Sequence, residues 1–334
     1  MARAYLAGFE VIARLGEGLN FEHYDAGWHS TATLGAIGAA AGCARLIGLD
    51  ASETARAMSL ACSAATGYTC QFGSHAKPVQ AGFAARAGVE AAYLAKAGLS
   101  AQPHVLDHPR GLAALMGGQK ADRLSNALSK LGMPYALSEH GLVLKPWPSC
   151  GYTHRIMTCA LALRARIPVD EIAQVILHMP DFHAAVLPFG SPDSRSEALF
   201  SAPFVAAMGL LQGDLTLADL DREAWRTPEI AALAARCELR PFRPKRPDLN
   251  YSPEDPDRIQ VTLRSGERHE ERCVYPVGAP EVPMSHSSVM AKFTSNLGQT
   301  PETSARHLAW IEELQAWPTA PSVLKLFFKE GGAT

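Results

Sequence analysis

Long hydrophobic runs and an excess of charge of one sign are both missing from this sequence of 334 residues. No stretch approaches the roughly 20 consecutive apolar residues that a bilayer-spanning helix needs, and Glu10 interrupts the N-terminus before the core of a signal peptide can build. The 31 Lys and Arg residues nearly balance the 33 Asp and Glu residues, which gives no global attraction to nucleic acid or to an anionic membrane. We therefore expect a soluble, cytoplasmic protein that has neither nucleic acid nor a membrane as a partner.

Signatures of a bound metal ion or cofactor are also missing. The seven cysteines form no CxxC pair and no Cys/His pair at zinc spacing, and their odd number favours reduced thiols packed as small hydrophobic side chains. The Gly-rich phosphate-binding patterns do not occur, and neither do the GxSxG and HExxH motifs. The sequence therefore predicts a protein that works without a metal ion and without an organic cofactor.

The distribution of residue types predicts two domains. The hydrophobic fraction of 47% excludes a mostly disordered chain, and the length allows two buried cores. Residues 1–139 are rich in Ala, Gly and Leu at helical spacing, residues 140–280 mix strand and helix patterns, and helical patterns return in residues 281–334. We expect a mainly α-helical domain built from both chain ends, with an inserted smaller α+β lid domain.

Helices and strands can be placed within this frame. The residues Asp50 to Glu53 form a variant of the capping box that opens a helix, Pro78 marks the first turn of another, and Ser265-Gly266 marks a hairpin turn. Helices are predicted at 4–14, 31–47, 51–65, 78–98, 109–116, 121–131, 152–166, 194–211, 228–235, 285–297, 303–315 and 322–329. Strands are predicted at 140–145, 173–179, 258–264 and 268–275, and a Pro-rich surface connection at 241–250.

Three short segments place a basic side chain next to a predicted helix start. His29 precedes the helix at 31–47, Lys77 precedes Pro78, and Lys145 opens a Pro-stiffened approach to the helix at 152–166. Free N–H groups and a partial positive charge at a helix N-terminus favour an anion. If the three segments converge, they form a pocket for a substrate with more than one carboxylate. The alternative is that both lysines are solvated surface residues.

Other candidates have structural explanations. Among the remaining histidines, His75, His154 and His178 are predicted to be structural or to contact the site residues without touching the substrate. Trp28 and Trp147 are predicted to be packing residues. A basic cluster of Arg240, Arg243, Lys245 and Arg246 could contact RNA, but the acidic residues nearby favour a solvated loop.

Several motifs together resemble the MmgE/PrpD family, which includes 2-methylcitrate dehydratase, cis-aconitate decarboxylase and iminodisuccinate epimerase. The motifs, in chain order, are HYDAGWHSTATLG at 23–35, SHAKPVQAG at 74–82, KPWPSCGYTH at 145–154, SEALFSAPF at 196–204 and PMSHSSVMAKF at 283–293. The resemblance spans nearly the whole chain.

The resemblance implies a helical domain with an α+β lid, a homodimer, and an active site between domain and lid. It places the active-site histidine of the family on His29 and its two lysines on Lys77 and Lys145, the residues that the helix-terminus argument selects. Lys77 and Lys145 would bind the substrate together with Cys150 and His154 of the lid-entry motif. Cys150 stands where family members differ, so it is expected to tune substrate choice.

The chain also departs from the family pattern. The resemblance implies a helical segment upstream of Met1, with an Asp-rich stretch and a further histidine assigned to catalysis, and no part of this chain matches it. A truncated or misassigned gene product, a second polypeptide that supplies the segment, and loss of the chemistry all remain open.

Three functions follow from these residues. The first is a cofactor-independent lyase, a dehydratase or decarboxylase, on a small di- or tricarboxylate, in which cationic Lys77 and Lys145 stabilise charge that develops next to a carboxylate and His29 transfers a proton. The second is an epimerase or isomerase of a dicarboxylate on the same scaffold. The third is a catalytically impaired family member that only binds small anions or pairs with a full-length partner.

Overall fold

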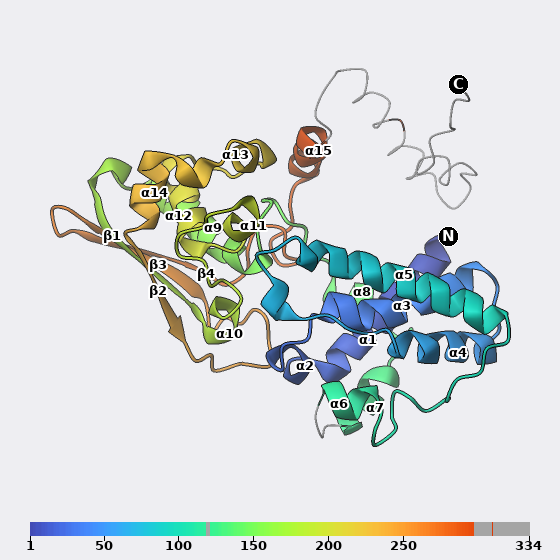
Figure 1. Cartoon of the computed structure of the whole chain (residues 1–334). Coiled ribbons are helices and arrows are strands. Elements are labelled where there is room, and N and C mark those ends of the chain that lie inside the picture. The colour runs from blue at the N-terminus through green and yellow to red at the C-terminus, as the bar shows by residue number, and fades with distance from the viewer. Residues whose placement is uncertain (118–120, 297–308, 310–334) are drawn as a thin grey trace, which may run out of the picture. The chain divides into compact units, whose positions relative to one another are not determined.

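The computed structural model describes residues 1–117, 121–296 and 309 (Figure 1). One compact unit spans Arg3–Pro283, and a second unit begins at Met284. The large unit opens with helices and continues as a mixture of helices and strands, as the sequence predicts. The boundaries predicted at residues 139/140 and 280/281, and the lid itself, stay predictions.

Four long helices form the first part of the large unit: α1 (Ala2–Leu19), α3 (Ser30–Leu46), α4 (Ala51–Cys62) and α5 (Ala76–Lys96). The predicted capping box at the start of α4 is confirmed, because the Asp50 carboxylate accepts from the backbone N–H of Glu53 while the Glu53 carboxylate accepts from that of Asp50. A side chain at Gly38 would lie 2.7 Å from the carbonyl oxygen of Gly8 and closer still to Ile12. Glycine is therefore required where α3 crosses α1.

Shorter helices connect this part to the next: α2 (Glu22–Asp25), α6 (Leu112–Met116), α7 (Ala121–Leu128) and α8 (Ala136–His140). The strand predicted at 140–145 is wrong. His140 ends α8, and the following residues form a loop in which Leu144 donates one backbone hydrogen bond to Gly278. The apolar run Leu142-Val143-Leu144 suggested a strand, but within the described residues no strand pairs with it, and Pro146 and Pro148 limit any continuation of such pairing.

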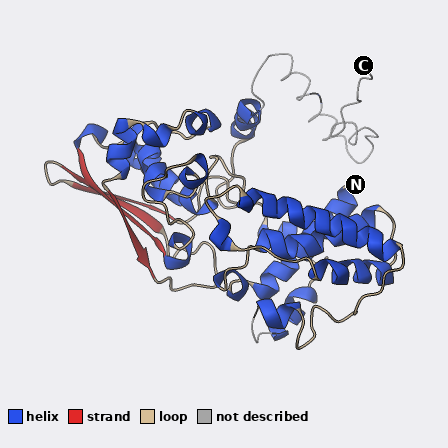
Figure 2. Ribbon diagram, in the orientation of Figure 1, coloured by secondary structure: helices blue, strands red, loops and turns tan. Residues whose placement is uncertain are grey.

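A four-stranded sheet organises the second part, with strand order β2-β1-β3-β4 (Figure 2). The strands are β1 (Ile172–Pro180), β2 (Cys237–Phe242), β3 (Asp257–Leu263) and β4 (Arg268–Cys273). β2 runs parallel to β1, whereas β3 runs antiparallel to both β1 and β4. The predicted β3–β4 hairpin is confirmed, and Gly266 has the positive φ of 89° that its turn requires. Strand β2 was missed because Pro241 within it suggested a loop.

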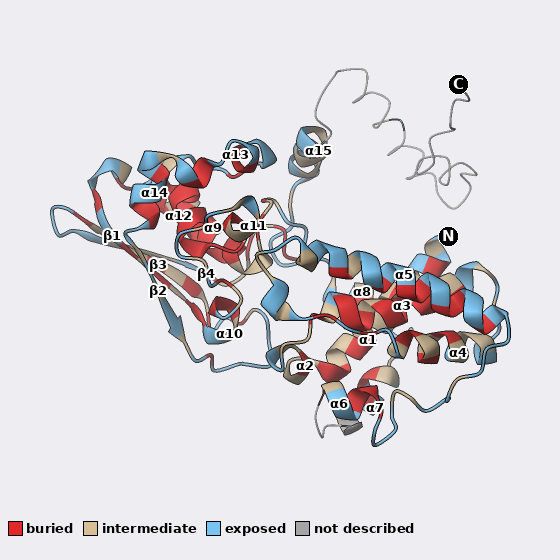
Figure 3. Ribbon diagram, viewed as in Figure 1, coloured by how far each residue is buried: buried red, intermediate tan, exposed pale blue. Residues whose placement is uncertain are grey.

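Helices α9 (His154–Arg164) and α12 (Ala202–Leu211) pack with one face of the sheet into a shared core, to which β1 contributes Val175 and Leu177. Almost every residue of α12 is buried, as Figure 3 shows. The single helix predicted at 194–211 is instead two helices, α11 (Arg195–Ala198) and α12. The Ser201 hydroxyl caps α12 and Pro203 occupies its first turn, so a new helix starts there.

The remaining short elements are α10 (Asp181–Ala184), α13 (Leu217–Asp221), α14 (Pro228–Ala234) and 3-10 turns at Thr69–Gln71, Gly151–Thr153, Val169–Glu171 and Ala224–Arg226. In the second unit, α15 (His286–Asn296) confirms the helix predicted at 285–297. The helices predicted at 303–315 and 322–329 lie outside the described residues, apart from residue 309. Across the described part of the chain, none of the helices combines the length and the apolar character that crossing a bilayer would require.

Candidate active site

His29 lies at the start of α3, where it is the N-cap residue and is 5% exposed. Its backbone N–H donates to the carbonyl oxygen of Gly67, next to a β-bridge between Trp28 and Tyr68. The edge of its ring meets the ring of Phe72 at a centroid distance of 5.1 Å. These contacts fix the imidazole in an apolar setting at the helix terminus, as the sequence predicts for its position.

Gln80 determines which nitrogen of His29 carries the proton. The Nδ1 atom of His29 lies 2.6 Å from Oε1 of Gln80, and Nε2 of Gln80 donates to the carbonyl oxygen of Tyr68 at 3.3 Å. Since the amide oxygen can only accept, Nδ1 of His29 must be the donor, which leaves Nε2 with its lone pair when the ring is neutral. Neutral His29 can thus act as a proton acceptor through Nε2.

Lys77 lies in the first turn of α5, which begins at Ala76, two residues before the predicted start. Its Nζ atom is 5.6 Å from the ring centroids of both Phe72 and Phe200, so aromatic faces flank the ammonium group. Burial lowers the pKa of Lys77, and the charge of Lys145 lowers it further, while Cys150 opposes the shift. A partly desolvated cation that already faces a second cation favours an incoming anion.

Lys145 lies in the loop after α8, and its Nζ atom donates to the carbonyl oxygen of Ser149 at 3.2 Å. The loop is anchored at Gly278, which has a φ of 94°. A Cβ atom at position 278 would lie 1.8 Å from the carbonyl oxygen of Leu144. This close approach, between residues 134 positions apart, holds the loop that carries Lys145 against the segment around Gly278.

Electrostatic coupling connects the three predicted residues. Burial lowers the pKa of His29 below its usual 6.5, and the charge of Lys77 lowers it further, although the hydrogen bond to Gln80 acts in the opposite direction. Lys145 acts in the same way on Lys77. These interactions make His29, Lys77 and Lys145 one electrostatic group, and the ring of Phe72 contacts both His29 and Lys77.

Cys150 belongs to the same group. Burial raises the pKa of its thiol, and the nearby charges of Lys145 and Lys77 only partly offset this effect. A thiol of raised pKa is a poor nucleophile at neutral pH. Tyr24 and Tyr152 also interact electrostatically with Cys150, and burial raises the pKa of both phenols, so they stay neutral donors.

His154 occupies a different environment. It is 1% exposed at the start of α9, and its ring meets the ring of Trp147 edge to face at 5.3 Å. The Nε1 atom of Trp147 donates to Asp214 at 3.1 Å. The assignment of His154 to substrate binding stays a prediction. Of the other two histidines considered, His75 is the exposed N-cap residue of α5, and His178 lies on β1.

Sequence reasoning missed Gln80 and Phe200. Gln80 lies three residues after Lys77 and is buried on the same helix, a spacing that places both on one face. That spacing was the available signal. Phe200 is distant in sequence and reaches Lys77 only in three dimensions, so no local pattern identifies it.

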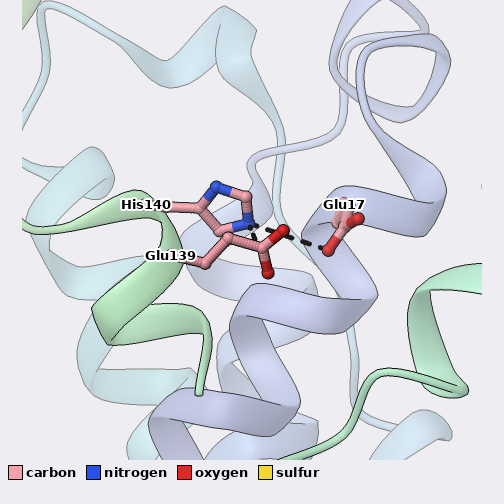
Figure 4. Close-up of side chains that lie close together, drawn as sticks. All are labelled: Glu17, Glu139 and His140. Atoms are coloured by element: carbon pink, nitrogen blue, oxygen red, sulfur yellow. Dashed lines mark ion pairs between the residues drawn. The ribbon is translucent and has the colours of Figure 1, made fainter. Parts of the chain in front are cut away.

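One group of potential metal ligands occurs among the described residues, away from His29. Glu17, Glu139 and His140 offer atoms within 4.8 Å of one another (Figure 4). Cations already neutralise the carboxylates, because Arg14 lies 2.7 Å from each and Lys130 lies 2.6 Å from Glu17. We interpret the group as an ion-pair network between α1 and α8 and not as a metal site.

Comparison with known proteins gives consistent matches. The model of the MmgE/PrpD N-terminal domain matches residues 1–124, and that of the MmgE/PrpD C-terminal domain matches residues 147–316. The chain is 28% identical over 279 residues to a mouse protein named cis-aconitate decarboxylase. The aligned region covers 80% of this chain and 55% of the mouse protein. It is 26% identical over 334 residues to the human protein of that name, and the aligned region covers 97% of this chain and 64% of the human protein. A protein of that name from Aspergillus terreus strain NIH 2624 is 24% identical over 320 residues, with 90% and 64% coverage. The chain thus spans less than two thirds of the length of these relatives.

Proposed function

The chain belongs to the MmgE/PrpD family, and from this premise we propose that it is a cofactor-independent lyase that removes CO₂ or water from a small di- or tricarboxylate. The observation that carries the proposal is that the ring of Phe72 contacts both the imidazole of His29 and the ammonium group of Lys77, while Lys145 lies near enough to Lys77 to lower its pKa. Relatives named cis-aconitate decarboxylase favour loss of CO₂ over loss of water.

Lys77 and Lys145 would bind two carboxylates of the substrate. When a bond next to a carboxylate breaks, negative charge develops on that carboxylate, and a fixed donor there is worth roughly 3 kcal/mol of barrier. The aromatic rings of Phe72 and Phe200 beside Lys77 exclude water, which strengthens the interaction between the cation and the developing charge.

His29 would transfer the proton. Its lowered pKa leaves the ring neutral at pH 7, and Gln80 reserves Nε2 for the reaction. In a dehydration, Nε2 would remove a proton from the carbon adjacent to the one that bears the hydroxyl, and the departing hydroxide would take up a proton from the solvent and leave as water. In a decarboxylation, the carbon that loses CO₂ must gain a proton, and an imidazolium formed beside the bound polyanion would supply it.

The test is an assay of cis-aconitate and related di- and tricarboxylates with His29→Ala, Lys77→Met and Lys145→Met. We expect release of CO₂ or water by the unmodified protein, a loss of at least 100-fold with His29→Ala, and weaker substrate binding in calorimetry with Lys145→Met. Lys96→Met is the control, because Lys96 lies exposed at the far end of α5.

The assay also separates the alternatives. Exchange of substrate hydrogen for deuterium from the solvent, without release of CO₂ or water, would indicate an epimerase or isomerase. No turnover of any polycarboxylate, with binding unchanged in Lys145→Met, would contradict the proposal and leave a protein without this chemistry.

A further inference from the structure

A row of basic side chains, three arginines and a histidine, crosses all four strands of the sheet. In the strand register, Arg240 of β2 lies opposite His178 of β1, His178 lies opposite Arg258 of β3, and Arg258 lies opposite Arg272 of β4. Residues directly opposite one another point to the same face of a sheet, with Cβ atoms about 5 Å apart. Three arginines and a histidine therefore stand side by side along one line.

The row lies on the face of the sheet that faces away from the buried core. The alternate residues of β1 and β3, such as Leu177 and Ile259, are buried, whereas His178 and Arg258 are half-buried and Arg272 is exposed. Like charges directly opposite one another are unfavourable in a sheet. In this row, Arg258 and Arg272 are such a pair.

Only the two outer arginines of the row are neutralised within the described residues. Glu238 holds Arg240 through two hydrogen bonds of 2.7 and 2.8 Å, and Glu270 holds Arg272 at 2.6 Å. Arg258, in the centre, has no carboxylate within ion-pairing distance among the described residues, although its charge helps to lower the pKa of nearby Glu270. The central guanidinium is therefore the arginine of the row that makes no direct ion pair within the described residues.

A hollow of about 350 Å³ lies next to the row. Arg258, Arg272 and Phe242 line it from the sheet, and Arg243 and Lys245 line it from the loop after β2. Within the described chain, neither Arg243 nor Lys245 has an ion-pair partner.

Two carboxylates also line the hollow, Glu254 and Asp255. The Asp255 carboxylate accepts the backbone N–H groups of Lys245 and Arg246, each at 2.8 Å, and so holds the loop in place. The hollow therefore collects more positive than negative charge around a rigid frame.

We propose that this hollow is a binding site for a small anion that carries two or more phosphate or carboxylate groups. Arginine binds both groups through paired, parallel hydrogen bonds, and the volume matches the lower end of small-ligand pockets. Glu238 and Glu270 flank the row and Glu254 lines the hollow, so an extended polyanion such as RNA would meet repulsion on either side. The site is separate from His29 and does not depend on the proposed lyase activity.

The experiment is calorimetric titration of the full chain with pyrophosphate and, separately, with citrate at constant ionic strength. The two arms distinguish a phosphate ligand from a carboxylate ligand. Each titration is run on the unmodified protein and on the Lys77→Met, Arg258→Met and Arg86→Met variants. Arg86 is an exposed arginine of α5 and serves as the matched control.

We expect saturable binding of at least one probe that persists in Lys77→Met and Arg86→Met and weakens at least 10-fold in Arg258→Met. The same probe should raise the Tm of the unmodified protein and not that of Arg258→Met. Without any anion and at low salt, Arg258→Met should have the higher Tm, because it removes repulsion from the row.

Equal affinity in Arg258→Met and in the unmodified protein would overturn the proposal, and so would binding that varies only with ionic strength, which would indicate an adventitious ion only. Citrate binding that Lys77→Met alone abolishes would assign the ligand to the candidate active site instead. Tighter binding of a single-stranded RNA oligomer than of either small probe, with the same loss in Arg258→Met, would replace the small anion with nucleic acid.

Discussion

The Nδ1 atom of His29 lies 2.6 Å from the Oε1 atom of Gln80, and this contact leaves the Nε2 atom of the neutral ring as the proton acceptor. The two residues are 51 positions apart, on α3 and α5, two helices that pack against each other. The contact gives Gln80 a positioning role, since it acts through His29 and not on the substrate.

Gln80→Leu should lower kcat by roughly 10- to 100-fold with a small change in KM, because the imidazole loses its fixed tautomer while the two lysines remain. Gln80→Glu keeps the acceptor oxygen for Nδ1 of His29 but loses the donor to Tyr68 and adds a charge that raises the pKa of His29, so it should recover only part of the activity. Kinetics over a range of substrate concentrations measure both values. Gln71→Leu, at an exposed position nearby, is the control. An equal loss in both Gln80 variants would argue for a packing role.

Lys77→Met should raise the pKa of His29 toward 6.5, because it removes a cation that disfavours the protonated ring. The rate of carbethoxylation of His29, followed by mass spectrometry as a function of pH, reports this pKa. An unchanged profile would mean that the two groups do not interact. Lys96→Met should leave the profile in place.

Gly278→Ala should displace the Lys145 loop. The added methyl group would clash with the Leu144 carbonyl, and alanine disfavours a φ of 94°, so we expect a loss of roughly 1–3 kcal/mol in the free energy of unfolding. Substrate affinity should fall together with stability. Gly98→Ala is the control, since its φ is also positive and a side chain there meets open space. Equal effects of the two substitutions on affinity would separate Gly278 from the position of Lys145.

Arg14→Met should destabilise the protein by about 3–5 kcal/mol, measured by urea unfolding. The Arg14 side chain is fully buried and lies 3.0 Å from the Glu10 carboxylate, which the substitution would leave without its cation. Lys130→Met removes an exposed partner of the same network and should change stability far less. Similar losses in both variants would contradict a buried ion pair as the stabilising feature.

Acid should destabilise the protein partly through His23. Burial lowers the pKa of His23 from 6.5 to about 4, and the ring, fully buried, lies 2.9 Å from the Thr33 hydroxyl. Below pH 6.5 the unfolded chain binds the proton that the folded chain excludes, so stability falls as the pH falls, by about 3 kcal/mol between pH 7 and pH 4. His23→Gln should flatten this slope in unfolding measurements at several pH values, whereas His75→Gln, at an exposed position, should not. An unchanged slope in His23→Gln would assign the acid sensitivity to other groups.

Local sequence signals determined much of the fold. Alternation predicted β1, the hairpin signal at Ser265-Gly266 predicted β3 and β4, the Asp50 capping box predicted the start of α4, and small residues at helical spacing predicted α3. Local signals failed where a partner decides the outcome. Residues 140–145 were predicted as a strand but, within the described residues, find no strand to pair with, whereas Pro241 lies in β2 because β1 supplies the ladder.

For the candidate site, the sequence by itself determined that His29 and Lys77 stand at helix starts and that Lys145 precedes one. Only the tertiary structure decided that Lys77 lies within electrostatic reach of the other two, that Gln80 fixes the imidazole, and that Phe200 flanks Lys77. The reason is physical. A helix start depends on interactions within a few residues, while the energy of a charge depends on every group near it in space, and those groups come from segments that are distant in the sequence.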